Sequence, residues 1–360
     1  MKDKVYTIIG TRPEIIRLAR IMPKLDAACH HTIIHTNQNC DYKLRDIFFD
    51  DLCLRKPDVT LEVSTSMLSA QISNMFVEVE KIFLETRPDK VLILGDTNSG
   101  LCAIIAERMG IPVYHMEAGN RCFDKRVPEE VNRRIIDSIS AYNMPYTPHS
   151  RENLIREGNN TKKLFMCGNP IMEVLAYYHD RIRSRRILDK LNLKEKKYFL
   201  ADFHRAETVD IPERLTNLIA GLNKVAKKFN RQVICSIHPR TREKLKAIDV
   251  KLDERVSFLE PFGFLDFVKL EQSAECVLSD SGLVSEETCM FGTPCVIIRD
   301  TTERPEIVES GSAMISGLDP DRMLMCTELM IGRKGWQVPV GHNDPNVSDK
   351  VVNFILGERQ

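Results

Sequence analysis

The chain has 360 residues, which at roughly 150 residues per domain predicts two globular domains, each with a core of its own. Lysine plus arginine and aspartate plus glutamate both number 51, and no long basic run or basic-aromatic stripe occurs, so nucleic acid is not expected as the main ligand. The eleven cysteines form no CxxC pair, which predicts reduced, mostly buried thiols and no zinc site. No signal peptide and no apolar run of about 18 residues is present, so we expect a cytoplasmic protein without a membrane span.

Short apolar runs alternate with longer amphipathic stretches along the whole chain, which is typical of βαβ units. Strands are expected at residues 4–9, 31–36, 90–94, 112–116, 163–166, 197–201, 232–236, 276–279 and 294–298. Helices are expected at residues 13–26, 66–84, 98–110, 129–140, 213–229, 265–273 and 284–291. The alternation predicts an α/β fold with a doubly wound parallel sheet in each half, and active-site residues beyond the carboxyl ends of the strands.

A change of organisation follows Gly168, where an extended run gives way to a polar, basic helical stretch. We therefore place one domain at residues 1–168 and a second at residues 169–343. In the tail, residues 344–360, Ser348 is expected to cap a last helix with an apolar face.

The first strand runs into residues 10–14 (GTRPE), a loop suited to binding an anion. Pro13 fits the first helical position, where its missing N–H is no loss. The free amides of the helix start and the guanidinium of Arg12 could then meet a phosphate. The alternative is an ordinary turn with a solvated arginine. Since only Gly10 is present, the loop is not a GxGxxG fingerprint, which disfavours a nicotinamide cofactor.

Three acidic residues follow strands or begin a helix in the first half. Asp96 comes after the strand at 90–94 and Glu117 after the strand at 112–116. If those strands are neighbours, the two carboxylates would repel and raise one another's pKa, as proton transfer requires; otherwise they are solvated loop acids. Glu129 follows Pro128 at a helix start, where an acid commonly serves only the helix dipole.

The second half places two histidines after strands. His204 and His238 are candidates for acid/base work or phosphate binding, although other histidines of the chain lie in an ordinary strand. Residues 280–282 (DSG) precede a helix and could form a phosphate cradle, with Glu286 or Glu287 accepting ribose hydroxyls. No set of side chains recurs at metal-ligand spacing.

Together these stretches resemble the non-hydrolysing UDP-N-acetylglucosamine 2-epimerase family over nearly the whole chain. The matching motifs, in the family's order, are residues 10–14 (GTRPE), 95–97 (GDT), 115–119 (HMEAG), 128–133 (PEEVNR), 204–205 (HR), 280–287 (DSGLVSEE) and 300–306 (DTTERPE). Other stretches look most like the capsule and O-antigen enzymes that form UDP-N-acetyl-L-fucosamine: residues 14–18 (EIIRL), 46–52 (DIFFDDL), 115–124 (HMEAGNRCFD), 261–264 (PFGF) and 346–350 (NVSDK).

The resemblance implies a GT-B architecture, with two Rossmann-like domains, the active site in the cleft between them, and a last helix that packs back on the first domain. It implies a catalytic role for Asp96, Glu117, Glu129 and His204. The residues that it implies for binding the UDP-sugar are Arg12, Arg17, Arg133, His238, Phe267, Ser281, Gly282, Glu287 and Arg304. It further implies a homodimer that uses no cofactor or metal, and a UDP-activated N-acetylated amino sugar as substrate.

The implied reaction inverts C2 of the sugar by eliminating UDP to a 2-acetamidoglycal and adding it back. The substrate would be a UDP-N-acetyl-L-talosamine-type sugar that becomes UDP-N-acetyl-L-fucosamine, or alternatively the pair UDP-N-acetylglucosamine and UDP-N-acetylmannosamine. Rival interpretations are a hydrolysing epimerase, a GT-B glycosyltransferase and a regulatory protein that only binds a UDP-sugar.

Overall fold

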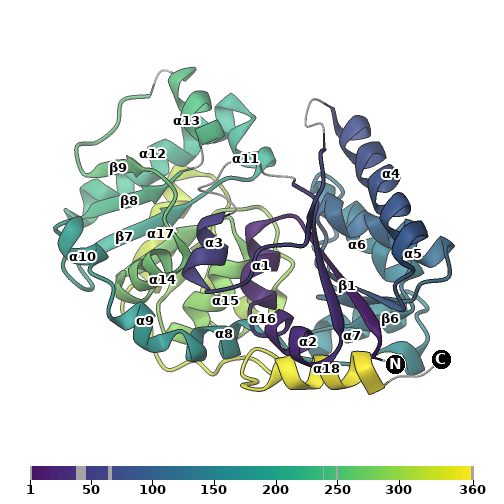
Figure 1. The fold of residues 1–360 in the computed structure, drawn as a ribbon. Helices are drawn as coiled ribbons and strands as arrows, with labels where there is room; N and C mark the ends of the chain where they lie inside the picture. Colours follow the sequence, from purple (N-terminus) through teal and green to yellow (C-terminus); the bar gives the residue numbers. More distant parts are fainter. Residues whose placement is uncertain (1, 38–45, 64–66, 238, 249, 358–360) are drawn as a thin grey trace. The chain divides into compact units, whose positions relative to one another are not determined.

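The computed structural model describes residues 2–37, 46–63, 67–237, 239–248 and 250–357, and divides the chain into two compact units. Unit 1 comprises Met1–Tyr177 and Val340–Gln360, and unit 2 comprises Tyr178–Pro339. The first junction lies nine residues after the expected one, because helix α8 (Ile171–Tyr177) contacts helix α1 of unit 1. Each unit has one six-stranded parallel sheet, which confirms the expected α/β class with two doubly wound sheets. Figure 1 shows strands and surrounding helices in each unit.

The sheet of unit 1 has the strand order β3-β2-β1-β4-β5-β6. Its strands are β1 (Lys4–Ile9), β2 (His30–His35), β3 (Val59–Thr60), β4 (Lys90–Leu94), β5 (Val113–Met116) and β6 (Tyr142–Met144). Its helices are α1 (Arg12–Leu18), α2 (Met22–Ala28), α3 (Asp46–Asp51), α4 (Leu68–Thr86), α5 (Ala103–Arg108), α6 (Pro128–Ile139), α7 (Pro148–Arg156), α8 and α18 (Val347–Gly357). The winding reverses between β1 and β4, and open α/β sheets bind ligands beyond the carboxyl ends at such a switch point.

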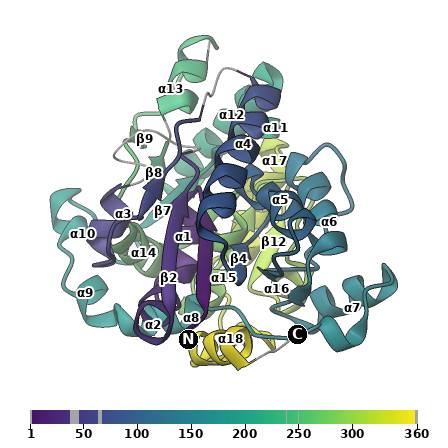
Figure 2. The ribbon, with the colours of Figure 1, turned by 45° about the vertical axis from the view of Figure 1, so that its right-hand side comes forward.

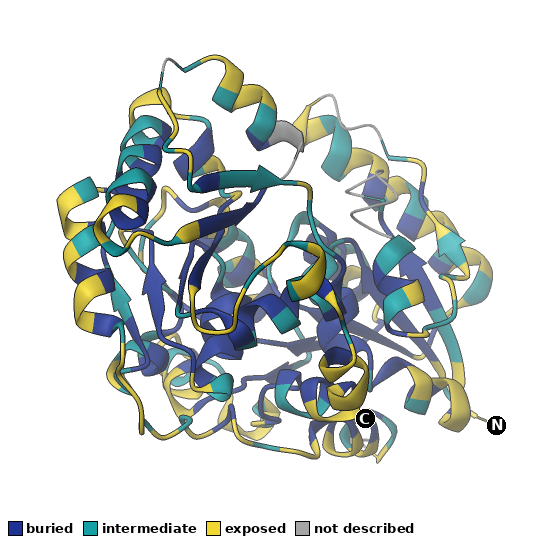
Figure 3. Ribbon diagram, turned by 90° about the vertical axis from the view of Figure 1, so that its left-hand side faces the viewer, coloured by how far each residue is buried: buried dark blue, intermediate teal, exposed yellow. Residues whose placement is uncertain are grey.

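Unit 2 repeats this topology with the order β12-β11-β10-β7-β8-β9, so its switch point lies between β7 and β10. Its strands are β7 (Tyr198–Asp202), β8 (Gln232–Ser236), β9 (Val256–Leu259), β10 (Cys276–Ser279), β11 (Cys295–Ile297) and β12 (Ala313–Ile315). Its helices are α9 (His179–Arg183), α10 (Ile187–Lys190), α11 (Ala206–Val209), α12 (Pro212–Phe229), α13 (Pro239–Lys246), α14 (Phe264–Ser273), α15 (Gly282–Phe291), α16 (Pro305–Glu309) and α17 (Pro320–Met330). Figure 3 shows its central strands almost entirely buried, as expected for a sheet covered on both faces.

Three expected elements differ from the structure. The helix expected at 98–110 is a 3₁₀ helix at Asn98–Cys102 followed by α5. The helix expected at 13–26 is two helices, because Pro23 lies in the first turn of α2 and cannot donate the backbone bond that would continue α1. The strand expected at 163–166 is wrong: Asn160 caps a 3₁₀ turn at Thr161–Lys163, and only Leu164 forms an isolated bridge, to Asn143.

The last helix, α18, belongs to unit 1 and lies beside α2 (Figures 1 and 2). Ser348 is inside this helix rather than its cap, and its backbone N–H donates to the Glu173 carboxylate of α8 at 2.8 Å. Phe354 stacks on Phe165 with ring centroids 4.2 Å apart, and its edge meets Tyr142. None of the helices in the described part of the chain is long and apolar enough to cross a membrane.

Candidate active site

The polar residues of unit 1 gather at its switch point. Helix α1, which follows β1, begins at Arg12, and the loop after the adjacent strand β4 carries Asp96. Strand β5 pairs with β4 on the other side, with Met116 opposite Leu94, so Glu117 leaves the same edge of the sheet. The parallel topology therefore brings to one edge three loops that are distant in the sequence.

Asp96 is oriented by an arginine of helix α6. Arg133 donates from Nε at 3.0 Å and from Nη2 at 2.6 Å, both to Oδ2 of Asp96. Asn132, the preceding residue of the helix, donates to the Asp96 backbone carbonyl at 3.0 Å. The Asp96 side chain keeps 23% of its surface exposed, whereas that of Arg133 keeps 3%. The carboxylate is thus held from one side and open on another.

Glu117 is held by a second arginine. Arg17 of α1 forms a buried ion pair with Oε2 of Glu117, and the Asn120 amide donates to Oε1 at 3.1 Å. Glu117 has a left-handed backbone, with φ of 65°, which is uncommon for a residue other than glycine and is typical of functional sites. The expected mutual repulsion of Asp96 and Glu117 is accordingly offset, because each carboxylate has its own arginine.

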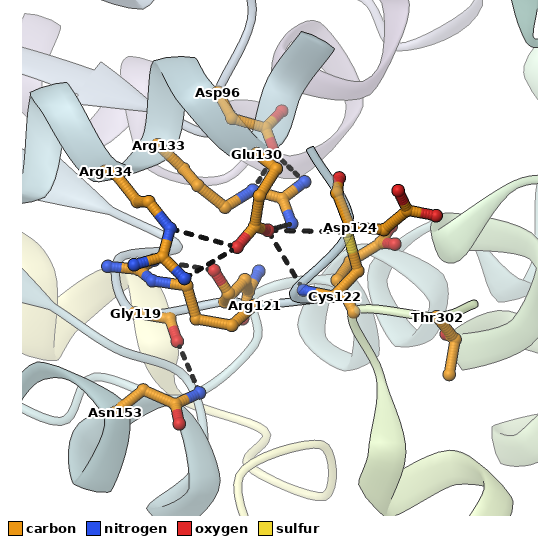
Figure 4. A network of polar contacts seen from close by, with 12 residues as sticks. Asp96, Gly119, Arg121, Cys122, Asp124, Glu130, Arg133, Arg134, Asn153 and Thr302 are labelled. Carbon is orange, nitrogen blue, oxygen red and sulfur yellow. Dashed lines mark hydrogen bonds and ion pairs between the residues drawn. The ribbon is translucent and has the colours of Figure 1, made fainter. Parts of the chain in front are cut away.

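Glu129 and Glu130 both begin helix α6, but their surroundings differ. Glu129 is half-buried, in the first turn of the helix. Glu130 is 1% exposed and accepts bonds from Arg133 at 3.1 Å, from Arg134 at 3.1 Å and from the Cys122 backbone N–H at 3.0 Å (Figure 4). Glu130 therefore does more than complement the helix dipole: it joins α6 to the loop that follows Glu117.

A further carboxylate, Glu14, lies buried at the start of α1. It accepts the backbone N–H groups of Gly10 and Thr11 and the Thr97 hydroxyl, the last at 2.6 Å. Burial raises the pKa of Glu14 to about 7, against the effect of these hydrogen bonds, and the charge of Asp96 adds to the rise. Glu14 thereby connects the loop after β1 to the loop of Asp96. The capping-box spacing of Thr11 and Glu14 could have indicated part of this role.

The histidine at the end of β5 serves the scaffold. His115 is fully buried, with Nδ1 2.9 Å from Asp137 and Nε2 2.8 Å from the carbonyl of Gly95. Burial opposes its charged form, but the hydrogen bond and charge of Asp137 raise the pKa of His115. Asp137 also accepts the Gly119 N–H at 3.0 Å and Arg121 at 2.7 Å. This buried network fixes the loops that carry Asp96 and Glu117.

In unit 2, His204 follows β7 and faces the loop after β10. Its backbone N–H and that of Arg205 donate to Oδ2 of Asp280, each at 3.0 Å. Its Nδ1 lies 3.4 Å from Oδ1 of Asp280, and its side chain is 43% exposed. Burial raises the pKa of Asp280 to about 6, and Arg205 limits the rise. At the switch point of unit 2, the accessible imidazole of His204 therefore lies next to the buried carboxylate of Asp280.

The amino end of α15 is closely packed. Ser281 has extended backbone before the helix, and Gly282 is its first residue. A Cβ on Gly282 would lie 2.7 Å from Oε1 of Glu303, so any side chain here would require the Glu303 carboxylate to shift. Arg304 forms a buried ion pair with Glu286. The backbone amides of this helix start suit an anion, as the sequence predicts.

The remaining expected binding residues have varied surroundings. Phe267 is 7% exposed and packs in the core beside Tyr198 and Leu270. Glu287 is buried in α15. His238 lies outside the described residues. Arg12 is half-buried, 5.9 Å from the ring centroid of Phe48.

The two Rossmann-type sheets, each with polar loops at its switch point, define the GT-B class of fold. A family model described as UDP-N-acetylglucosamine 2-epimerase matches residues 24–356. The UDP-N-acetylglucosamine 2-epimerase of Methanocaldococcus jannaschii is 38% identical over 365 residues, with 98% of each chain covered. A crystal structure of UDP-GlcNAc 2-epimerase from the same organism, in complex with UDP-GlcNAc and UDP, has a TM-score of 0.94 over 99% of this chain and 100% of that chain, at 36% identity.

The UDP-2,3-diacetamido-2,3-dideoxy-D-glucuronate 2-epimerase of Pseudomonas aeruginosa is 33% identical over 335 residues, covering 92% of this chain and 93% of that protein. The chain belongs to the UDP-N-acetylglucosamine 2-epimerase family. It is an isomerase that acts on a nucleotide sugar.

Proposed function

We propose that the protein inverts C2 of a UDP-activated 2-acetamido sugar through a 2-acetamidoglycal. The C2 hydrogen has no adjacent carbonyl, so its direct removal as a proton is too difficult at neutral pH. A carboxylate removes this proton as the bond between C1 and the diphosphate oxygen breaks, and a C1–C2 double bond forms. Protonation on the other face of C2 and return of UDP to C1 complete the inversion.

The observation that carries this proposal is the pair of carboxylates, Asp96 and Glu117, at the ends of neighbouring strands and each oriented by an arginine. Two positioned carboxylates suit proton transfer at two faces of one carbon, with Glu129 stabilising positive charge at C1. The negative charge that develops on the leaving diphosphate is stabilised by Arg12, by His204 and by the helix start at Ser281 and Gly282. Arg17, His238, Phe267, Glu287 and Arg304 complete the proposed binding set for the UDP-sugar.

For the sugar, we propose the UDP-N-acetyl-L-talosamine-type substrate and UDP-N-acetyl-L-fucosamine as product, supported by the stretch 115–124 (HMEAGNRCFD). A second candidate, UDP-N-acetylglucosamine, is supported by the names of the relatives that are 37% and 38% identical. The expectations of a cytoplasmic homodimer that serves surface-polysaccharide synthesis are supported by the family resemblance.

The test is an NMR assay in deuterium oxide in which each UDP-sugar is offered alone, without an acceptor. We expect the epimer to appear with one deuterium at C2, from one of the two sugars. Product without deuterium would exclude the elimination route. Free UDP that accumulates in proportion to sugar would instead indicate a hydrolysing enzyme.

The proposed role of Asp96 predicts a specific defect for Asp96→Asn. We expect kcat to fall by about 100-fold or more, while the Kd for UDP changes less than about threefold, because proton transfer is lost but ground-state binding is not. Calorimetry with UDP and the NMR assay measure the two quantities. An equal loss of both would indicate that Asp96 maintains the structure of the site instead.

A further inference from the structure

Arg133 has a contact pattern that its predicted role in binding diphosphate does not explain. All three nitrogens of its guanidinium donate to carboxylates: Nε and Nη2 to Asp96, and Nη1 to Glu130. Its side chain is 3% exposed. A guanidinium recognises a phosphate with the same planar fork of N–H groups that it uses for a carboxylate. In this structure that fork is already occupied by Asp96.

The partner on the other side of Arg133 is itself fixed. Glu130 is buried one turn before Arg133 on α6, and its Oε2 also accepts the Cys122 N–H at 3.0 Å. Its Oε1 accepts two bonds from Arg134, each at 3.1 Å. Arg133 therefore cannot turn toward another anion without leaving a buried glutamate with less compensation of its charge, which is costly.

Resting on the proposed function, we infer that Arg133, locked by Glu130, is a positioning residue for Asp96 and not a ligand of the diphosphate. Both Arg133 bonds end on Oδ2 of Asp96. This holds Oδ2 in the ion pair and leaves Oδ1 as the oxygen that exchanges the proton with C2 of the sugar. Holding a reacting group in one orientation removes entropy from the activation step.

The experiment compares Arg133→Gln and Arg133→Lys with Arg134→Gln. Arg134 is the matched control, because it donates to Oε1 of Glu130, whereas Arg133 and the Cys122 N–H bind Oε2, so its loss leaves the contact that holds Arg133 in place. Its side chain is 41% exposed. For Arg133→Gln we expect kcat to fall by about 100-fold and the Kd for UDP to stay within about threefold. Arg133→Lys keeps the positive charge but loses the paired N–H donors to Asp96. Its kcat should therefore be about tenfold higher than that of Arg133→Gln. Arg134→Gln should stay within about threefold in both quantities.

Three outcomes would overturn the inference. One is a Kd for UDP that weakens more than about tenfold in Arg133→Gln, as expected for a lost phosphate ligand. Another is a kcat that stays within about threefold of wild type in this variant. The third is an equal loss of kcat in Arg134→Gln, which would indicate general loosening of α6. If Arg133→Gln does not give a cooperative thermal transition, Arg133→Lys decides by kcat: we expect it about tenfold below wild type with the Kd for UDP within about threefold, and a kcat within about threefold of wild type would overturn the inference.

A failure of the proposed function gives a different result. The wild-type protein would then epimerise neither UDP-sugar, whereas the UDP affinity of the Arg133 variants, which needs no turnover, still decides whether Arg133 binds the diphosphate.

Discussion

Glu14 is the residue of unit 1 in which folding and protonation are most directly linked. Its carboxyl group is buried and bonded to three donors from two loops, yet burial raises its pKa from 4.5 to about 7. A group whose pKa is raised on folding favours the folded state most below its unfolded pKa, and this advantage is lost as the pH rises through the folded pKa. The affected window therefore runs from about pH 4.5 to about pH 7.

Glu14→Gln should remove this contribution. A rise in the pKa of Glu14 from 4.5 to about 7 corresponds to roughly 3 kcal/mol. As the pH increases through this window, the free energy of unfolding of the wild type should fall by about that amount relative to that of Glu14→Gln. Urea unfolding at several pH values measures the difference. Glu152→Gln, an exposed position of α7, is the control and should follow the wild-type curve. Parallel curves for wild type and Glu14→Gln would contradict the prediction.

At the scale of elements, the start of α15 depends on the absence of a side chain. In Gly282→Ala the new Cβ would meet Glu303, which cannot yield freely because it also accepts bonds from Arg205 and from Arg299 at 2.8 Å. We expect a loss of about 1–3 kcal/mol in stability and about tenfold weaker UDP binding, measured by urea unfolding and calorimetry. Gly357→Ala is the control, since its Cβ would meet nothing within 4 Å. An unchanged affinity of Gly282→Ala for UDP would show that this helix start does not bind the nucleotide.

Helix α18 is held to unit 1 by its buried aliphatic face, by the Ser348 bond to Glu173 and by an aromatic cluster around Phe354. Phe354→Ala removes the stack on Phe165 and the edge contacts with Tyr114 and Tyr142, so we expect a loss of about 2–4 kcal/mol in stability. Asn353→Ala, at an exposed position of the same helix, should change the urea midpoint little. Equal midpoints for both variants would show that α18 is held by other contacts.

Most strands, including the three-residue β11, could be predicted from their apolar runs, but β3, β6, β9 and β12 could not. Strands β1, β4, β8 and β10 have the expected bounds, because each is an apolar run between turn residues. The two-residue β3 and the three-residue β6 and β12 were not predicted, since so short a run has no period and the adjacent strand supplies its pairing. The break between α1 and α2 could have been predicted, because Pro23 itself indicates that a helix cannot continue through this position.

The loops that carry Asp96 and Glu117 followed from the same reasoning, because a parallel sheet sends every strand end to one edge. The pairing of each carboxylate with its arginine could not be predicted in this way. Arg17 is 100 residues from Glu117 and Arg133 is 37 residues from Asp96, and no local pattern pairs side chains at such separations. The buried state of Glu14 likewise depends on helices and strands packed around it, which a motif of five residues does not reveal.

At the scale of the whole molecule, two units with separate cores should respond separately to a local change. Phe354→Ala should speed hydrogen exchange in β4 and β5 of unit 1 and leave β7 and β8 of unit 2 unchanged. Mass spectrometry of peptides from these strands measures the effect. Faster exchange of equal size in all four strands would mean that the units unfold as one.

Unit 1 is discontinuous, since its sheet is complete by residue 144 but α18 begins at Val347. During synthesis, at about 5–20 residues per second, a ribosome needs on the order of 10–40 s to translate the intervening chain. During that time the aromatic surface of Tyr142 and Phe165 is not covered by α18. Unit 2 is continuous in sequence and can fold as soon as its own residues have been translated. The unit that is translated first is therefore the one that matures last, and its uncovered surface is where we expect a chaperone to bind the nascent chain.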